Sequence, residues 1–279
     1  MRTRIFNKMT AQEVEDYLAR GGDTIVIAMG VVEVHGACPI DCETAGAEGL
    51  AIAMADAMDG LALVNLPYFY PGGTVISNGT VHITIRDGID YLMKICGSLA
   101  DQGFKRMYLV NGHGPSLHTA NAVCREFFDE YRIPMCNIGM VNLQMRAARN
   151  GWKGDLDAMM YGAYKMMGQL DFMPIDPNAT ESHGERIPTD PAMSKFMDLY
   201  RKYGGYGATA QIYSDPRQHG GGRIFKSREE LEAVADEGIE QLRTLVQAVD
   251  FMALNAALAE YQAYVDRTCK KFPRVAPKR

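Results

Sequence analysis

Glutamate, aspartate and histidine residues gather in two short segments that each follow an apolar run. The first reads Gly30-Val-Val-Glu-Val-His-Gly36 and continues through Pro39-Ile-Asp-Cys-Glu-Thr44, and the second is Asn111-Gly-His-Gly114. In an extended chain, residues i and i+2 point the same way, so Glu33 and His35 can face one pocket. Carboxylate and imidazole groups suit Zn²⁺ and Mn²⁺, which predicts a divalent metal site.

Further ligands for such a site occur in the same segments. Glu43 or Asp41 can return from the start of the following helix, and His113 can enter from the second loop. A pair of ions about 3.5–4 Å apart is commonly held by a shared carboxylate. The alternative interpretation makes Glu33 and His35 ordinary polar loop residues, because the spacing Glu-x-His has little specificity by itself.

A third segment, Glu181-Ser-His-Gly-Glu185, places two carboxylates around one histidine. The functional interpretation makes His183 a proton shuttle, because an imidazole with a pKa of about 6.5 exchanges protons near neutral pH. One of the two glutamates, Glu181 or Glu185, is then a metal ligand. The alternative interpretation is a solvated polar loop.

The other histidines and the cysteines carry weaker signals. His82 and His118 are given structural or surface roles, whereas His219 lies in a loop, Asp215-Pro-Arg-Gln-His-Gly-Gly-Gly222, that could close over the site. Cys38 and Cys42 leave a structural zinc site or a cysteine nucleophile open as minor alternatives. The sequence contains no Walker loop, dinucleotide-binding fingerprint or G-x-S-x-G elbow.

The elements around these segments predict a layered α/β fold. Strands are expected at 24–29, 61–66, 80–85, 106–110 and 133–140. Helices are expected at about 45–58, 89–99 and 117–131. This alternation favours a three-layer α/β/α sandwich around a mostly parallel sheet. Ligands of such sheets bind beyond the carboxyl ends of the strands, where both loops should open on one edge.

A single domain of residues 1–279 is the simplest organisation, because no repeat or linker divides the chain. Ser227-Arg-Glu-Glu230 is a capping-box signature that opens a long helical stretch to about residue 265, broken at most once. Residues 270–279 are expected to form a loose basic tail. Residues 150–225 are rich in Gly, Pro, Asp and Met and predict loops and short helices over the site.

Composition and charge exclude several classes of protein. The chain has 29 Lys and Arg against 34 Asp and Glu, so its net charge is −5. This argues against nucleic acid as a partner, because nucleic-acid binders need a basic face. No apolar run reaches the roughly 20 residues that span a bilayer, so no membrane association is expected. Residues 1–10 lack the apolar stretch of a signal peptide, which favours a cytoplasmic location.

The three segments together resemble the creatininase family of creatinine amidohydrolases and related enzymes. Gly30–Gly36 and Pro39–Thr44 are similar to its patterns G-S-x-E-Q-H-G and P-L-x-x-D-T. Gly103–Gly114 is similar to G-F-r-r-i-x-l-v-N-G-H-G, and Glu181–Glu185 looks like a shortened H-A-G-E-x-E-T-S. Ser214-Asp-Pro216 is a weaker match to G-D-P. The motifs occur in family order over residues 24–225.

The resemblance implies a layered α/β fold, two divalent metal ions per chain, usually zinc or manganese, and a homo-oligomer, often a hexamer. By position, the metal ligands are Glu33, His35 and His113, with Glu43 or Asp41 at the bridging position. His183 matches the histidine that handles protons near the substrate. The remaining candidates are Glu181 in catalysis and, for substrate binding, Asn111, Gly112 and Gly114.

The sequence departs from the family pattern in three places. The bridging position is Glu rather than Asp, and Pro115 stands where creatininase has a metal-binding glutamate. The last ligand must therefore come from elsewhere, and Glu185 is our choice. The triplet Glu-Thr-Ser is replaced by Arg186-Ile-Pro-Thr189. We therefore expect a small cyclic substrate related to creatinine rather than creatinine itself.

These observations predict a metal-dependent hydrolase that opens a cyclic amide at its C–N bond. A metal-activated water would attack the carbonyl, and His183 would deliver a proton to the leaving nitrogen. One alternative is hydrolysis of a C–C bond in a cyclic 1,3-diketone, such as an oxidised inositol of the 3-dehydro-scyllo-inosose type. Another alternative is a non-catalytic metal-binding subunit.

Overall fold

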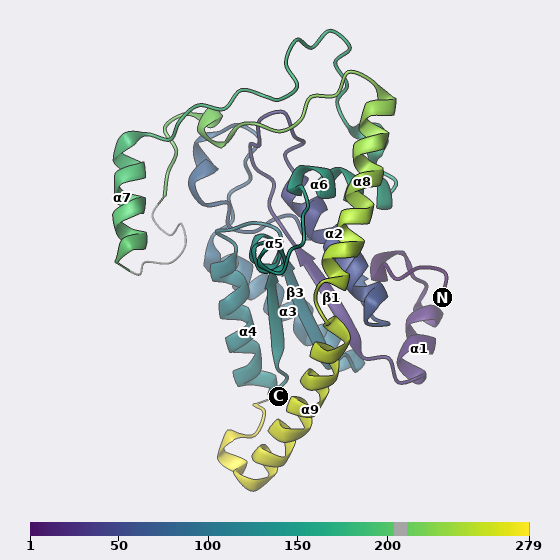
Figure 1. The fold of residues 1–279 in the computed structure, drawn as a ribbon. Helices are drawn as coiled ribbons and strands as arrows, with labels where there is room; N and C mark the ends of the chain where they lie inside the picture. Colours follow the sequence, from purple (N-terminus) through teal and green to yellow (C-terminus); the bar gives the residue numbers. More distant parts are fainter. Residues whose placement is uncertain (204–210, 279) are drawn as a thin grey trace.

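The computed structural model describes residues 1–203 and 211–278 of the chain. Within this part, four parallel strands form one sheet in the spatial order β2-β1-β3-β4 (Figure 1). They are β1 (Thr24–Met29), β2 (Leu61–Leu63), β3 (Arg106–Asn111) and β4 (Met135–Gly139). The parallel register places Met29 opposite Asn111, so the loops that follow β1 and β3 leave the sheet side by side.

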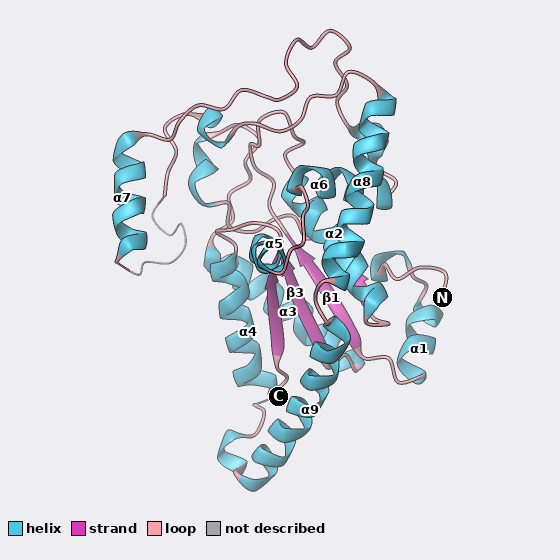
Figure 2. Ribbon diagram, viewed as in Figure 1, coloured by secondary structure: helices cyan, strands magenta, loops and turns pink. Residues whose placement is uncertain are grey.

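Helices cover both faces of this sheet (Figure 2). One face carries α2 (Cys42–Ala57), α5 (Met140–Arg149), α6 (Leu156–Met166), α8 (Arg228–Gln247) and α9 (Phe251–Lys271). The other face carries α1 (Ala11–Ala19), α3 (Ile85–Gln102) and α4 (Leu117–Tyr131). The arrangement confirms the predicted three-layer α/β/α fold.

The central strand β1 explains the two-sided core, because every one of its side chains is buried. Successive side chains of a strand point to opposite faces. Val26 and Ala28 pack with the layer that contains α2, whereas Ile25 and Ile27 pack with the layer that contains α3 and α4. A continuous apolar run is what a parallel strand covered on both faces requires.

The predicted strand at 80–85 is wrong. Residues 80–84 form a loop, and α3 begins at Ile85. The Thr84 side chain accepts a hydrogen bond from the backbone N–H of Asp87 at 3.2 Å, and its hydroxyl donates to the Asp87 carboxylate at 2.6 Å. Such an N-terminal cap stabilises a helix by about 1 kcal/mol and favours a helix that begins at Ile85.

The C-terminal helical stretch is broken once, as expected. α8 ends at Gln247, and α9 begins after Asp250, whose carboxylate accepts a hydrogen bond from the backbone N–H of Ala253 at 2.8 Å. α9 continues to Lys271, so the first part of the expected loose tail is helical. The backbone N–H of Lys278 donates to the carbonyl of Glu130 at 2.8 Å, which ties the tail to α4. Arg279 lies outside the described residues.

The described part of residues 150–225 contains α6, the helix α7 (Pro191–Lys202) and long loops, in agreement with the sequence. Figure 1 shows α7 standing apart from the helical layers. The short 3-10 helices of the described chain are η1 (Phe6–Lys8), η2 (Gly72–Ile76), η3 (Leu170–Phe172), η4 (Pro216–His219) and η5 (Pro273–Val275). No single described helix is long and apolar enough to cross a membrane, although α8 and α9, bent by 47°, meet those criteria as a pair.

Candidate metal centre

The polar residues singled out in the sequence meet at the carboxyl edge of β1 and β3. The backbone N–H of Gly112 donates to the carbonyl of Met29 at 3.2 Å, which joins the two loops. A Cβ atom on Gly112 would lie 2.1 Å from the carbonyl oxygen of Glu43. Only glycine therefore allows the loop after β3 to lie this close to the first turn of α2.

The first candidate metal-binding group consists of Glu33, Glu43 and His113, whose ligand atoms lie within 4.8 Å of one another. His113 Nδ1 is 2.5 Å from Glu43 Oε2 and 3.2 Å from Glu33 Oε1. His113 Nε2 is 3.2 Å from the carbonyl oxygen of Pro71. Histidines that bind metals commonly donate their second N–H to such a carbonyl, which leaves the other nitrogen free to coordinate.

The second candidate group consists of Glu33, His35 and His219, again within 4.8 Å. His219 Nε2 is 3.2 Å from Glu33 Oε1. The rings of His35 and His219 meet edge to face, with centroids 4.7 Å apart. Within the described part of the chain, the buried Nδ1 atom of His35 has no hydrogen-bond partner. An unpaired buried nitrogen is costly, and a bound cation would satisfy it.

Charge at the site favours a cation. Burial opposes ionisation of Glu43, but the charge of His113 and its hydrogen bond outweigh burial and lower the pKa of Glu43 to about 2. Burial disfavours a charged His113, yet Glu43 and Glu33 raise the pKa of His113 to about 9. Both shifts show that this group of side chains favours positive charge next to its carboxylates. A divalent ion could supply that charge, because metal binding displaces protons from histidine and carboxylate ligands.

Thr74 fixes the orientation of Glu33 from η2. Its hydroxyl donates a hydrogen bond to Glu33 Oε2, and its side chain is buried. The other oxygen, Oε1, faces both His113 and His219. No local sequence pattern marks Thr74, because the contact depends on the path of the loop between β2 and α3.

The loop after β3 is braced by its own first residue. The Asn111 amide donates to the carbonyl of His113 at 2.7 Å, and its oxygen accepts from the His113 backbone N–H at 3.2 Å. Next to this loop lies a cavity of about 400 Å³. Its lining comprises Asn111, Gly112, His113, Gly114, Pro115, Leu117, Gly139, Met140, Val141, Asn142, Met197 and Arg201. The three residues predicted to bind substrate therefore line a cavity beside His113.

Two predicted ligands lie outside both groups. Asp41 precedes α2, and its carboxylate accepts a hydrogen bond from the hydroxyl of Tyr164. Glu185 is exposed and pairs with Arg217 at 3.2 Å. Among the described residues, the structure thus brings together Glu43 rather than Asp41, and His219 rather than Glu185.

The segment 181–185 approaches the site through its backbone. The N–H of Gly184 donates to the carbonyl of Gly222 at 2.9 Å, and the neighbouring Gly221 carbonyl accepts from the N–H of Ala37 at 2.8 Å. The side chain of His183 is exposed, with Nδ1 3.0 Å from the Ser182 hydroxyl. Glu181 is also exposed and belongs to neither metal-binding group.

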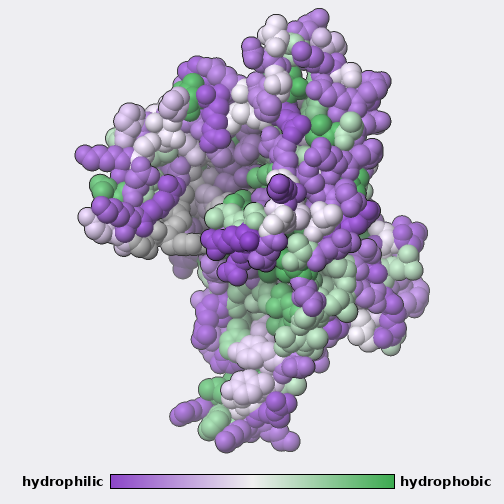
Figure 3. All heavy atoms as spheres, in the orientation of Figure 1, coloured by the Kyte–Doolittle hydropathy of each residue, from purple (hydrophilic) through white to green (hydrophobic). Residues whose placement is uncertain are grey.

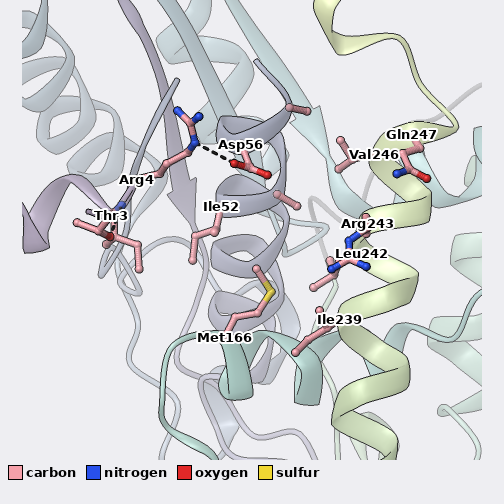
Figure 4. Close-up of a pocket in the computed structure, with 13 residues that line it drawn as sticks. Thr3, Arg4, Ile52, Asp56, Met166, Ile239, Leu242, Arg243, Val246 and Gln247 are labelled. Atoms are coloured by element: carbon pink, nitrogen blue, oxygen red, sulfur yellow. Dashed lines mark hydrogen bonds and ion pairs between the residues drawn. The ribbon is translucent and has the colours of Figure 1, made fainter. Parts of the chain in front are cut away.

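Another cavity, of about 460 Å³, lies between the N-terminal segment, α2 and α8 (Figure 4). Arg4 pairs with Asp56 at 2.9 Å on its rim, and Ile52, Met166 and Leu242 form part of its wall. This cavity lies near the C-terminal end of α2, whereas Glu43 lies at the N-terminal end. Both candidate metal-binding groups lie away from this cavity, since none of their residues is among the described residues that line it.

A sheet edge with buried carboxylates and imidazoles defines an α/β protein with a candidate divalent metal centre. A family model named Creatininase and described as creatinine amidohydrolase matches residues 7–193. The chain belongs to the creatininase family, which confirms the resemblance seen in the sequence. No curated protein matches the sequence.

Solved structures share the fold at low sequence identity. A putative creatinine amidohydrolase from Bacteroides fragilis is 16% identical, with a TM-score of 0.56 over 91% of this chain and 98% of that chain. A creatininase carrying a tryptophan substitution is 17% identical, with a TM-score of 0.54 over 88% and 98%. A creatininase variant described as Zn-Zn type is 17% identical, with a TM-score of 0.51 over 88% and 98%.

Proposed function

We propose that this protein is a metal-dependent hydrolase that opens a small cyclic amide. The proposal rests mainly on the buried group of Glu33, Glu43 and His113 at the carboxyl edge of the sheet. Bound divalent ions would supply a water of lowered pKa and a positive charge that polarises a carbonyl. Glu33 and Glu43 would supply the negative charge that holds the cations, and the Pro71 carbonyl would orient His113.

Two ions per chain, zinc or manganese, fit the donors that are present. The two groups offer carboxylate oxygens and imidazole nitrogens, which both metals accept. The solved structure of a creatininase variant is described as Zn-Zn type, which supports zinc as the first metal to test. The orphaned Nδ1 of His35 supports a cation at the second group.

His183 is the proposed proton carrier to the leaving nitrogen. Its side chain is exposed and can change position. The backbone of the segment 181–185 hydrogen-bonds to Gly222, and the adjacent Gly221 contacts Ala37. An imidazole suits this role because it both accepts and donates protons near neutral pH. Glu181, two residues away in the sequence, is the proposed catalytic neighbour.

Ring opening of a cyclic 1,3-diketone is a second candidate function. Pro115 packs against Gly72 and offers no ligand atom where creatininase has a glutamate, so this site departs from the creatininase pattern. A diketone would break at a C–C bond, and a cation would stabilise the enolate that leaves.

The test is turnover by metal-loaded protein on panels of cyclic amides and cyclic 1,3-diketones. We expect ring opening in one panel, loss of turnover on chelation, and recovery when zinc or manganese is restored. Turnover that survives complete metal removal would contradict the proposal. Full metal content without turnover on either panel would favour the non-catalytic metal-binding subunit.

We also propose that the protein forms a homo-oligomer. Figure 3 shows hydrophobic residues on the face that carries α5 and the junction of α8 and α9. Exposed apolar side chains on these elements include Val141, Met145 and Met252. Burial of this face in a symmetric assembly would remove it from water. Light scattering coupled to gel filtration measures the mass, and a monomer at all concentrations would contradict the proposal.

A further inference from the structure

We propose that His219 completes the second metal position in this chain, and that Glu33, rather than Glu43, is the carboxylate shared by the two positions. This inference rests on the proposed metal centre and assigns one of its ligands to the loop 214–222. In place of Glu185, the ligand expected from the sequence, it names a residue that lies 186 positions after Glu33.

The position of one oxygen atom identifies the shared carboxylate. Glu33 Oε1 lies 3.2 Å from His113 Nδ1 and 3.2 Å from His219 Nε2, so it stands between the two histidines. Thr74 binds the other oxygen and thereby keeps Oε1 turned toward them. Glu33 belongs to both candidate groups, whereas Glu43 belongs to the first group only.

His35 and His219 supply the nitrogen atoms of the second position. The Nδ1 atom of His35 is buried without a hydrogen-bond partner in the described chain, and the ring of His219 meets its ring at 4.7 Å. A cation between these rings and Glu33 would have one carboxylate and two imidazole ligands. Three protein ligands with a position left open is the arrangement typical of catalytic zinc sites.

The backbone holds the loop 214–222 in place on two sides. The N–H of Tyr213 donates to the carbonyl of Gly73 at 3.0 Å, and the ring of Tyr213 stacks on His219 at 5.5 Å. On the other side, the Gly221 carbonyl accepts from Ala37 at 2.8 Å. Gly36 has a φ of +62°, and a Cβ there would lie 2.3 Å from that same carbonyl. This close fit explains the glycine and fixes the distance from the loop to His35.

The competing donors are less well placed. Glu185 is exposed, and its carboxylate is paired with Arg217. Pro115 has no donor atom on its side chain. His219 is therefore the residue best placed in the described chain to replace the missing glutamate.

The test compares metal binding by the wild type, His219→Ala and Glu185→Gln. Each full-length protein is dialysed against zinc or manganese, and its metal content is measured by elemental analysis. His82→Ala serves as the control, because His82 is an exposed histidine outside both groups. We expect about two ions in the wild type, in Glu185→Gln and in His82→Ala. We expect about one ion in His219→Ala, since loss of one of three protein ligands weakens a metal site strongly.

The possible outcomes separate this inference from the proposed function. Two ions held by His219→Ala with wild-type affinity, or loss of one ion in Glu185→Gln alone, would overturn the assignment of His219 and leave the hydrolase proposal intact. A wild-type chain with fewer than two ions would overturn the two-ion site and this inference together.

Hydrogen exchange provides a second measurement, which compares the wild type with two different variants at His219 and so does not rely on one variant being correctly folded. Added metal should slow exchange of the backbone amides of residues 214–222 in the wild type at least tenfold, because a ligand pins the loop. The same metal should leave these amides unchanged in His219→Ala and in His219→Gln. Equal protection in the wild type and both variants would overturn the inference.

Discussion

Replacement of Glu48 by Gln should change the pH dependence of stability in a defined direction. Glu48 lies in α2 with only 4% of its surface exposed, and its Oε1 accepts a hydrogen bond from the backbone N–H of Asn65 at 2.6 Å. Burial raises the pKa of this carboxyl from 4.5 to about 7, although the Asn65 hydrogen bond opposes the change. The folded protein therefore holds a proton that the unfolded chain releases.

The sign follows from this difference in proton binding. Between about pH 4.5 and pH 7 the folded state binds more protons at Glu48 than the unfolded state, so the free energy of unfolding falls as pH rises through this window. At about 1.36 kcal/mol per pH unit, the loss amounts to about 3 kcal/mol. Above pH 7 both states are ionised, and the loss stays constant.

Glu48→Gln removes the titration and keeps an oxygen for the Asn65 N–H. Burying the amide in place of the carboxyl changes the free energy of unfolding by an amount that does not depend on pH. That amount cancels when the difference between variant and wild type at one pH is subtracted from the difference at another pH. We expect Glu48→Gln to gain about 3 kcal/mol relative to the wild type between about pH 5 and about pH 8. The assay is equilibrium unfolding in urea at both pH values with saturating metal.

Glu260→Gln is the control, because this glutamate is exposed on α9 and carries the same change of net charge. Its stability relative to the wild type should differ little between the two pH values. The reasoning would be refuted if Glu48→Gln showed the same stability difference from the wild type at both pH values.

The remaining predictions concern the proposed site. Thr74→Val should weaken metal binding about 10–100-fold with little change in fold, because Glu33 loses the hydrogen bond that orients it. Calorimetric titration with zinc measures the affinity, and an unchanged affinity would show that Thr74 does not support the site. His183→Ala should retain metal and lose turnover by about 100-fold or more if it carries the proton. Steady-state kinetics and metal analysis on the same sample test this role, which full activity would exclude.

The sequence predicted the parts of the fold that depend on local pattern. The buried runs of β1 and β3 are continuous and apolar, and the rule that loops of parallel strands share one edge was enough to bring Glu33 and His113 together. The sequence could not choose between Asp41 and Glu43. That choice depends on where α2 begins, and the structure turns Asp41 toward Tyr164.

The contribution of His219 depends on tertiary contacts that no local pattern encodes. Its loop reaches the site through backbone hydrogen bonds of Tyr213 and Gly221 to segments far away in the sequence. The sequence of this loop suggests closure over the site, but no local pattern marks its histidine as a metal ligand. The expected strand at 80–85 was wrong for a local reason, because Thr84 caps a helix that begins at Ile85.

Metal content of the purified wild type and of His113→Ala tests the central claim most directly. His113 is buried between Glu33 and Glu43, so its loss removes a nitrogen ligand from the first position and leaves two carboxylates facing each other. We predict about two zinc or manganese ions per wild-type chain, the stoichiometry of a two-metal site, and loss of metal together with activity in the variant. A wild type that takes up no divalent ion, or an active variant that keeps its metal, would contradict the account.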